Sequence, residues 1–268
     1  MQYDKVKHSL GVFFNKYIFM RKLFYSLLDL LLLRSWHIRM EIQKWKKTIS
    51  ASVKILDAGS GFGQYTYYLA KKIKNSEIKG LDIKPEQIED CNGFAQKAGL
   101  KNVIFEMADL TKLDEKPIYD LVITVDVMEH ILEDELVFQN FYKLLKPAGI
   151  LLISTPSDQG GSDVHDHGDE SFIDEHVRDG YGIQDITDKL KRSGFSQVEA
   201  KYSYGKAGSI SWRLSMKYPM QMLNVSKLFF ILLPVYYVLT YPFAYLLNWI
   251  DLYSQNKTGT GLIVKATK

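Results

Sequence analysis

The sequence predicts an α/β fold in which helices cover both faces of a doubly wound, mostly parallel sheet. Two observations predict it. Short apolar runs typical of strands alternate with helical patterns from residue 51 to residue 155. Each helical pattern also falls between two strand patterns, where a parallel sheet needs its crossover connections. Helices placed in this way bury both faces of the sheet.

The elements follow one another in a regular order. The strand patterns lie at 53–57, 77–82, 102–106, 119–125 and 149–154. Helical patterns lie between or after them at 64–74, 85–98, 129–132, 134–145 and 183–193. Stop signals are Gly99, Pro147, Gly149 and Gly194. The segments FSQVEAKYSYG and TGLIVKATK predict the last two strands.

Two segments interrupt this alternation and divide the chain into three parts. Residues 1–50 predict a basic helical arm, with ten Lys and Arg against three acidic residues. Residues 51–205 and 257–268 form the sheet domain, and residues 206–256 form an apolar helical insertion before the last strand. The arm either meets anionic lipid or covers the domain with its apolar side.

Residues 228–250 contain no charged side chain, and their length suits a membrane-crossing helix. A single crossing would separate the last strand from its sheet, so a bent or hairpin-like pair of helices is expected, with Pro234 and Pro242 as break points. Four roles remain open: insertion into one leaflet, lining an acceptor pocket, contact across a homodimer, or completion of the core.

The composition limits the compartment and the chemistry. The chain has 268 residues, a net charge of +3 and one cysteine, Cys91. A lone cysteine excludes a disulfide within the chain and a site made of several thiolates. No stretch resembles a secretory signal. A cytoplasmic location is therefore expected, with peripheral attachment to the cytoplasmic face of the membrane as an open alternative.

The run VKILDAGSGFGQYTYYLA joins a strand to a helix through a glycine loop, and such loops hold nucleotide cofactors. Acidic residues near the loop narrow the choice of cofactor. Asp57 precedes the first glycine, where a carboxylate suits an ammonium group and would repel a diphosphate. Asp82 ends the second strand, where it suits a ribose, and Asp109 follows the third, where it suits an adenine amino group. The pattern favours a cationic adenosine without phosphate.

The motifs ILDAGSGFG, GLDIKPEQI, MADLTKL, YDLVITVDVMEHI and LLKPAGILLISTPS resemble the class I S-adenosylmethionine-dependent methyltransferases in order and spacing. The subgroup with the most similar motifs methylates quinones and other small molecules or lipids. The resemblance implies a Rossmann-like sheet with an antiparallel last strand and implies S-adenosylmethionine as the cofactor. The residues that it assigns to the cofactor are Asp57, Gly59, Ser60, Gly61, Asp82, Ile83, Asp109, Leu110 and Asp126.

Each of these residues has an expected place. The glycine loop and Asp57 would surround the methionine part, which Asp126 would approach after the fourth strand. Asp82 would bind the ribose and Ile83 would pack on the adenine, while Asp109 and Leu110 would lie at the edge of the ring.

Methyl transfer from a sulfonium mainly requires alignment of the acceptor and exclusion of water. His130 is the candidate general base for an acceptor that must lose a proton. The alternative is that Glu129 and His130 only tie their loop to the neighbouring backbone. His176 and Arg178, in a segment that forms part of the substrate lid in the resembling family, are candidates for acceptor contact. A metal site at His165 and His167 with Asp163 or Asp166 is the less favoured interpretation, and no metal is expected.

The sequence therefore predicts methyl transfer from S-adenosylmethionine to a small, apolar or lipid-like acceptor. Two alternatives remain: an NAD-dependent oxidoreductase, and a membrane-associated binding protein that keeps the cofactor fold without turnover. Nucleic acid is not expected as the acceptor, because the sheet domain has no basic run.

Overall fold

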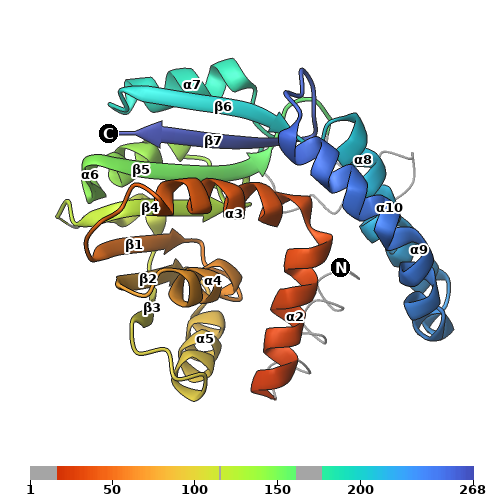
Figure 1. Ribbon diagram of the computed structural model, residues 1–268. Coiled ribbons are helices and arrows are strands. Elements are labelled where there is room, and N and C mark those ends of the chain that lie inside the picture. Colours follow the sequence, from red (N-terminus) through yellow and green to blue (C-terminus); the bar gives the residue numbers. More distant parts are fainter. Residues whose placement is uncertain (1–16, 115, 161–176) are drawn as a thin grey trace.

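The structure, a computed structural model, describes residues 17–114, 116–160 and 177–268 (Figure 1). Its strands are β1 (Val53–Ala58), β2 (Ser76–Asp82), β3 (Val103–Met107), β4 (Tyr119–Val125), β5 (Leu145–Pro156), β6 (Gln197–Ser203) and β7 (Gly261–Thr267). Its α-helices are α2 (Ile18–Leu31), α3 (Leu33–Lys46), α4 (Gln64–Lys72), α5 (Pro85–Lys97), α6 (Asp134–Leu144), α7 (Ile183–Arg192), α8 (Lys206–Trp212), α9 (Tyr218–Val225) and α10 (Leu233–Tyr253).

The strands form one sheet in the order β3-β2-β1-β4-β5-β7-β6. The pairs among β1 to β5 are parallel, whereas β7 is antiparallel to both β5 and β6. This arrangement confirms the predicted fold class, including the antiparallel last strand. The expected helix at 129–132 is only the short 3-10 turn η2 (Met128–His130), because α6 begins four residues later.

Apolar side chains cover both faces of the sheet. Neighbouring residues of a strand point to opposite faces, so Ile55 and Leu56 of β1 belong to two different buried clusters. Ile55 packs in a cluster with Ile42 of α3 and Leu69 of α4. Leu56 packs in the other with Phe138 of α6. The sheet is therefore held from both sides, and its carboxyl edge is left to form a site.

The basic arm contributes two helices with different surroundings. Helix α3 lies on the sheet and buries Ile38, Ile42 and Trp45. At Leu32 the backbone becomes extended, and α2 turns away from the sheet along α4 and α5 (Figure 1). The arm thus covers the domain through α3, while α2 keeps a largely open outer side.

The insertion folds as a helical hairpin whose turn comes just before Pro234 and not at Pro242. Helix α10 packs against α8, and α9 follows α8 through a π-helical turn, η3 (Arg213–Lys217). The 3-10 turn η4 (Lys227–Ile231) reverses the chain before α10. Pro234 lies in the first turn of α10, where a missing amide proton costs nothing.

Pro242 lies inside α10, which continues through it. The prediction of a break at Pro242 was wrong. An internal proline removes one backbone hydrogen bond, and the contacts of α10 with α8 and η3 keep the helix continuous. Within the described ranges, no helix combines the length and the apolarity that crossing a membrane requires.

Candidate functional site

The glycine loop folds back over the end of β2. The backbone N–H groups of Gly59 and Ser60 both donate to the carbonyl of Leu81, at 2.8 and 2.7 Å. Gly59 and Gly61 have φ angles of +79° and +50°, a region that glycine reaches without strain. A Cβ on Gly59 would collide with the side chain of Val127, lying 2.9 Å from its Cγ1. A Cβ on Gly61 would meet nothing within 4 Å. The loop therefore packs tightly at Gly59 and exposes bare backbone at Gly61.

Asp82 joins this loop to the end of β2. One oxygen of its carboxylate accepts a hydrogen bond from the N–H of Gly61 at 2.8 Å, and the other accepts from the N–H of Lys84 at 3.0 Å. The next residue, Ile83, is an apolar side chain that is 64% exposed. The carboxylate and this open apolar surface are adjacent, as a sugar and an attached base would require.

Asp57 lies beneath the loop. Its carboxylate is buried and accepts a hydrogen bond from the Thr66 hydroxyl at 2.6 Å. Burial raises the pKa of Asp57 to about 6. The buried hydroxyl of Ser60 has no hydrogen-bond partner among the described residues. Such a group is costly unless something satisfies it, which makes Ser60 a candidate ligand contact.

Asp109 caps the 3-10 turn η1 (Leu110–Lys112). Its carboxylate accepts from the N–H and the hydroxyl of Thr111, at 3.0 and 2.7 Å, and these bonds lower the pKa of Asp109. Leu110 is buried in the core. The structure thus gives Asp109 a local capping role, and contact with an adenine ring remains a prediction for both residues.

Asp126 follows β4 and carries a positive φ of 53°, which is unusual for a residue with a side chain. Its carboxylate forms an ion pair with Arg34 of α3 at 2.6 Å. The backbone N–H of Arg34 donates to the Tyr204 hydroxyl at the end of β6, and Tyr204 also has a positive φ, 54°. Non-glycine residues in this region are often associated with functional sites. The arm, β4 and β6 therefore meet at the carboxyl edge.

Glu129 and His130 differ in their surroundings. The Glu129 side chain is buried and accepts a hydrogen bond from the Thr155 hydroxyl at 3.1 Å. Burial, together with the nearby charge of Asp126, raises the pKa of Glu129 to about 8. His130 ends the turn η2 with an exposed side chain. A base role for His130 remains a prediction. The buried Glu129 carboxyl, with its raised pKa, can also hold a proton in this turn.

Two members of this edge, Arg34 and Tyr204, could not be identified from the sequence. They lie 170 residues apart and meet only through the fold. The basic character of the arm was the only signal for Arg34, and it did not identify Asp126 as the partner.

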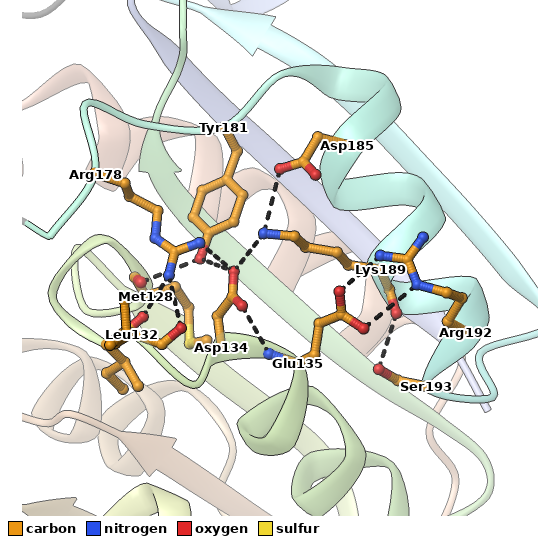
Figure 2. A network of polar contacts seen from close by, with 11 residues as sticks. Met128, Leu132, Asp134, Glu135, Arg178, Tyr181, Asp185, Lys189, Arg192 and Ser193 are labelled. Atoms are coloured by element: carbon orange, nitrogen blue, oxygen red, sulfur yellow. Dashed lines mark hydrogen bonds and ion pairs between the residues drawn. The ribbon is translucent and has the colours of Figure 1, made fainter.

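Arg178 belongs to a polar network that joins η2, α6 and α7 (Figure 2). Its guanidinium forms an ion pair with Asp134 and donates to the Ile131 and Leu132 carbonyls at 2.6 and 3.1 Å. Lys189 of α7 also pairs with Asp134, at 2.8 Å. These contacts give Arg178 a role in holding η2 and the start of α6, while acceptor contact remains a prediction.

Two of the earlier assignments concern residues that lie outside the described ranges. They are the acceptor contact at His176 and the alternative metal ligands, Asp163, His165, Asp166 and His167. Within residues 17–114, 116–160 and 177–268, no group of three or more His, Cys, Asp or Glu side chains could hold a metal ion.

Tyr181 is the centre of the network in Figure 2 and gives a first prediction. Its buried hydroxyl donates to Asp134 at 2.8 Å and lies 3.1 Å from the Met128 carbonyl. Tyr181→Phe should lower the free energy of unfolding by about 1.5 kcal/mol, because a buried carboxylate loses one of its donors. Urea unfolding measures this loss.

Tyr202→Phe is the matched control, because among the described residues the Tyr202 hydroxyl accepts one exposed hydrogen bond, from the Gln159 amide. That variant should change stability by less than about 0.5 kcal/mol. If the two variants lost the same free energy of unfolding, burial of the Tyr181 hydroxyl would not be the cause of its contribution to stability.

Comparison with known proteins identifies the family of the chain. Residues 49–199 match the family described as "Methyltransferase domain", which is more than half of the chain. Phosphoethanolamine N-methyltransferase 1 of Zea mays is 30% identical over 161 residues, covering 58% of this chain and 30% of that protein. Ubiquinone biosynthesis O-methyltransferase of Rickettsia prowazekii (strain Madrid E) is 33% identical over 123 residues, covering 44% of this chain and 48% of that protein. The chain thus matches less than half the length of these curated relatives.

A solved structure gives the same fold. Phosphoethanolamine N-methyltransferase 2 of Haemonchus contortus, in complex with S-adenosyl-L-methionine, aligns with a TM-score of 0.62 at 18% identity, covering 87% of this chain and 52% of that one. Its likeness concerns the fold alone, whereas the family match covers the motifs themselves. The predicted class, the S-adenosylmethionine-dependent methyltransferases of class I, is thereby confirmed, and the chain belongs to the methyltransferase domain family.

Proposed function

We propose that the chain transfers the methyl group of S-adenosylmethionine to a small, apolar or lipid-like acceptor near a membrane surface. One observation carries the proposal: the glycine loop, Asp82 and Asp126 lie together at the carboxyl edge of adjacent strands in a methyltransferase domain. In open α/β sheets, ligands bind at this edge, outside the carboxyl ends of the strands.

The residues of the loop fit the cofactor. The open space above Gly61 accepts a ligand against bare backbone, and the Ser60 hydroxyl is buried without a described partner. Asp82 would hold the ribose while Ile83 packs on the adenine, with Asp109 and Leu110 at its edge. Asp57, beneath the loop, and Asp126 would place negative charge near the ammonium and sulfonium groups.

Asp57 disfavours NAD as the cofactor. A diphosphate beside its carboxylate would be repelled, and no described residue of the loop from Gly59 to Gly63 is basic. Together with the adenine contact expected at Asp109, this charge argues against the oxidoreductase alternative.

For the transfer step, the cofactor supplies an electrophilic methyl group on a good leaving group. The chain orients the two reactants, keeps water out and removes a proton where the acceptor has one. His130 is the proposed base. Glu129 lies beside it in η2, and its raised pKa near 8 lets the buried carboxyl hold a proton at neutral pH.

The exposed apolar surface of α10 supports an apolar acceptor. Leu239, Leu246 and Ile250 are exposed apolar side chains on a helix that packs at the carboxyl edge of the sheet. An apolar acceptor would enter beside such a surface. The Rickettsia relative is named for O-methylation in ubiquinone biosynthesis, which supports an apolar acceptor, whereas the maize relative is named for N-methylation of phosphoethanolamine.

The test combines binding with turnover. Calorimetry should show that the protein binds S-adenosylmethionine and its demethylated product in preference to NAD. Incubation with cofactor labelled in the methyl group and an extract of native lipids should then yield a labelled, organic-soluble product. Preferential binding of NAD would overturn the cofactor. Cofactor binding without labelled product from lipid or polar extracts would favour the binding-protein alternative.

A further inference from the structure

Helix α2 buries polar side chains and exposes apolar ones, which is the opposite of a helix on a water-facing surface. Its buried residues are Arg21 and Tyr25. Its exposed residues include Phe19, Leu23 and Leu27, of which Phe19 is 73% exposed. These three are spaced at i, i+4 and i+8, so they form one stripe on the outer face. An exposed apolar stripe over a buried arginine calls for an apolar occupant.

The inner face of α2 holds the cofactor loop. The Arg21 guanidinium donates to the Phe62 carbonyl at 2.9 Å, and the Tyr25 hydroxyl donates to the same oxygen. Arg21 is fixed in turn by an ion pair with Asp90 of α5 and by a 2.7 Å hydrogen bond to the Tyr25 hydroxyl. Because Phe62 lies between Gly61 and Gly63, the position of α2 sets the backbone of the loop.

The carboxyl end of α2 is connected to the insertion. Near the end of α2, the Leu30 carbonyl accepts hydrogen bonds from the Tyr241 hydroxyl of α10 at 2.8 Å and from the Trp36 indole at 3.3 Å. Trp36 also packs edge-on against Tyr245 of α10. Both helices leave the sheet at its carboxyl edge (Figure 1). We call the exposed apolar side chains of these two helices the α2–α10 surface: Phe19, Leu23, Leu27, Leu30, Val235, Val238, Leu239, Phe243, Leu246, Trp249 and Ile250.

Charge favours an anionic bilayer as the occupant of this surface. Residues 206–250 carry Lys206, Arg213, Lys217 and Lys227 and no acidic residue. Exposed aromatic rings such as Trp249 and Tyr253 suit the boundary between headgroups and acyl chains. A second copy bound through this surface would instead bring the basic segments 206–250 of two chains together, which is unfavourable.

We propose that the α2–α10 surface binds an anionic lipid bilayer and that α2 transmits this binding to the cofactor loop through Arg21 and Tyr25. Lipid on the outer face fixes α2, and the fixed inner face holds the Phe62 carbonyl in the geometry that binds the cofactor. The inference rests on the proposed function, since it takes the glycine loop as the S-adenosylmethionine site. Arg21 and Tyr25 are positioning residues.

The test measures the Kd of the full chain for S-adenosylmethionine without vesicles, with phosphatidylcholine vesicles, and with vesicles that also contain phosphatidylglycerol. The anionic vesicles should lower the Kd about tenfold, and the cofactor should strengthen vesicle binding by the same factor, because coupling between two sites is reciprocal. Phosphatidylcholine vesicles should have a smaller effect.

Variants separate the two faces of α2. Phe19→Ser with Leu23→Ser should abolish the vesicle effect, whereas Ile104→Ser, an exposed apolar residue on β3, should keep it. Tyr25→Phe and Arg21→Gln should raise the Kd for the cofactor and uncouple it from vesicles, with Arg21→Lys restoring part of the affinity. The KM for the acceptor should be unchanged, which a general loss of structure would not allow.

Two outcomes would overturn the inference itself, and a third would overturn the proposed function on which it rests. Vesicle binding without any change in cofactor Kd would refute the coupling and leave the proposed function intact. The protein could instead form a dimer and fail to bind vesicles. If the double variant Phe19→Ser, Leu23→Ser then dissociated this dimer, the surface would be assigned to a second copy of the chain. Absence of cofactor binding under every condition would instead refute the proposed function.

Discussion

Gly59→Ala should destabilise the protein by about 3 kcal/mol and abolish measurable binding of S-adenosylmethionine. The left-handed φ of +79° costs an alanine about 1–2 kcal/mol, and the new Cβ collides with Val127 at a further cost of about 1–3 kcal/mol. The loop must shift to relieve the collision, which moves the two N–H groups that bond to Leu81. Urea unfolding and calorimetry measure the two effects.

Gly61→Ala is the matched control, because its Cβ meets no described atom within 4 Å. It should cost only about 1–2 kcal/mol of stability, yet it should weaken cofactor binding, since the new methyl group occupies the space above the loop. Val127→Ala should restore part of the stability of Gly59→Ala, because the Cγ atoms of Val127 make its closest contacts. No recovery in the double variant would show that the collision is not the cause.

The second large effect is expected for Asp82→Ala, which should weaken binding of S-adenosylmethionine about 100-fold. Two hydrogen bonds from ribose hydroxyls to a carboxylate are worth about 3 kcal/mol together, and this free energy corresponds to that factor. The variant also removes the acceptor of the Gly61 N–H. Calorimetry measures the affinity, and Asp82→Asn should fall between the wild type and Asp82→Ala.

Asp120→Ala provides the control for this experiment. Its carboxylate also accepts from a backbone N–H, that of Lys54 at 2.7 Å, but near the start of β1 and β4, away from the carboxyl edge. Cofactor affinity should be unchanged in this variant. If the two alanine variants lost affinity equally, the place of Asp82 beside the ribose would be contradicted.

The sheet and the gathering of its acidic residues were predictable, because both depend on local patterns. Apolar runs located every strand, and the rule that parallel strands end at one edge brings Asp57, Asp82 and Asp126 together. The ion-pair partner of Asp126, by contrast, is distant in the sequence. Arg34 meets Asp126 only because α3 packs on the sheet, and a helix pattern does not specify that placement.

Two other differences have physical causes. Judged from the local sequence, a proline predicts the end of a helix. Helix α10 nevertheless continues through Pro242, because its tertiary contacts outweigh one lost hydrogen bond. Arg178 was assigned to the acceptor because its segment forms part of the substrate lid in the resembling family, and that role remains a prediction. Its pairing with Asp134 depends on how α6 and α7 pack, so a count of nearby charges did not reveal it.

The place of β7 in the sheet affects how the chain is made. Among the strands that the structure describes, β6 pairs with β7 alone, and the 57 residues between Ser203 and Gly261 include the whole helical insertion. During synthesis on the ribosome, β6 and the apolar hairpin emerge before the strand that anchors them exists. Closing so long a loop is slow. The hairpin therefore passes through a period in which chaperones or a lipid surface can reach it before the sheet is complete.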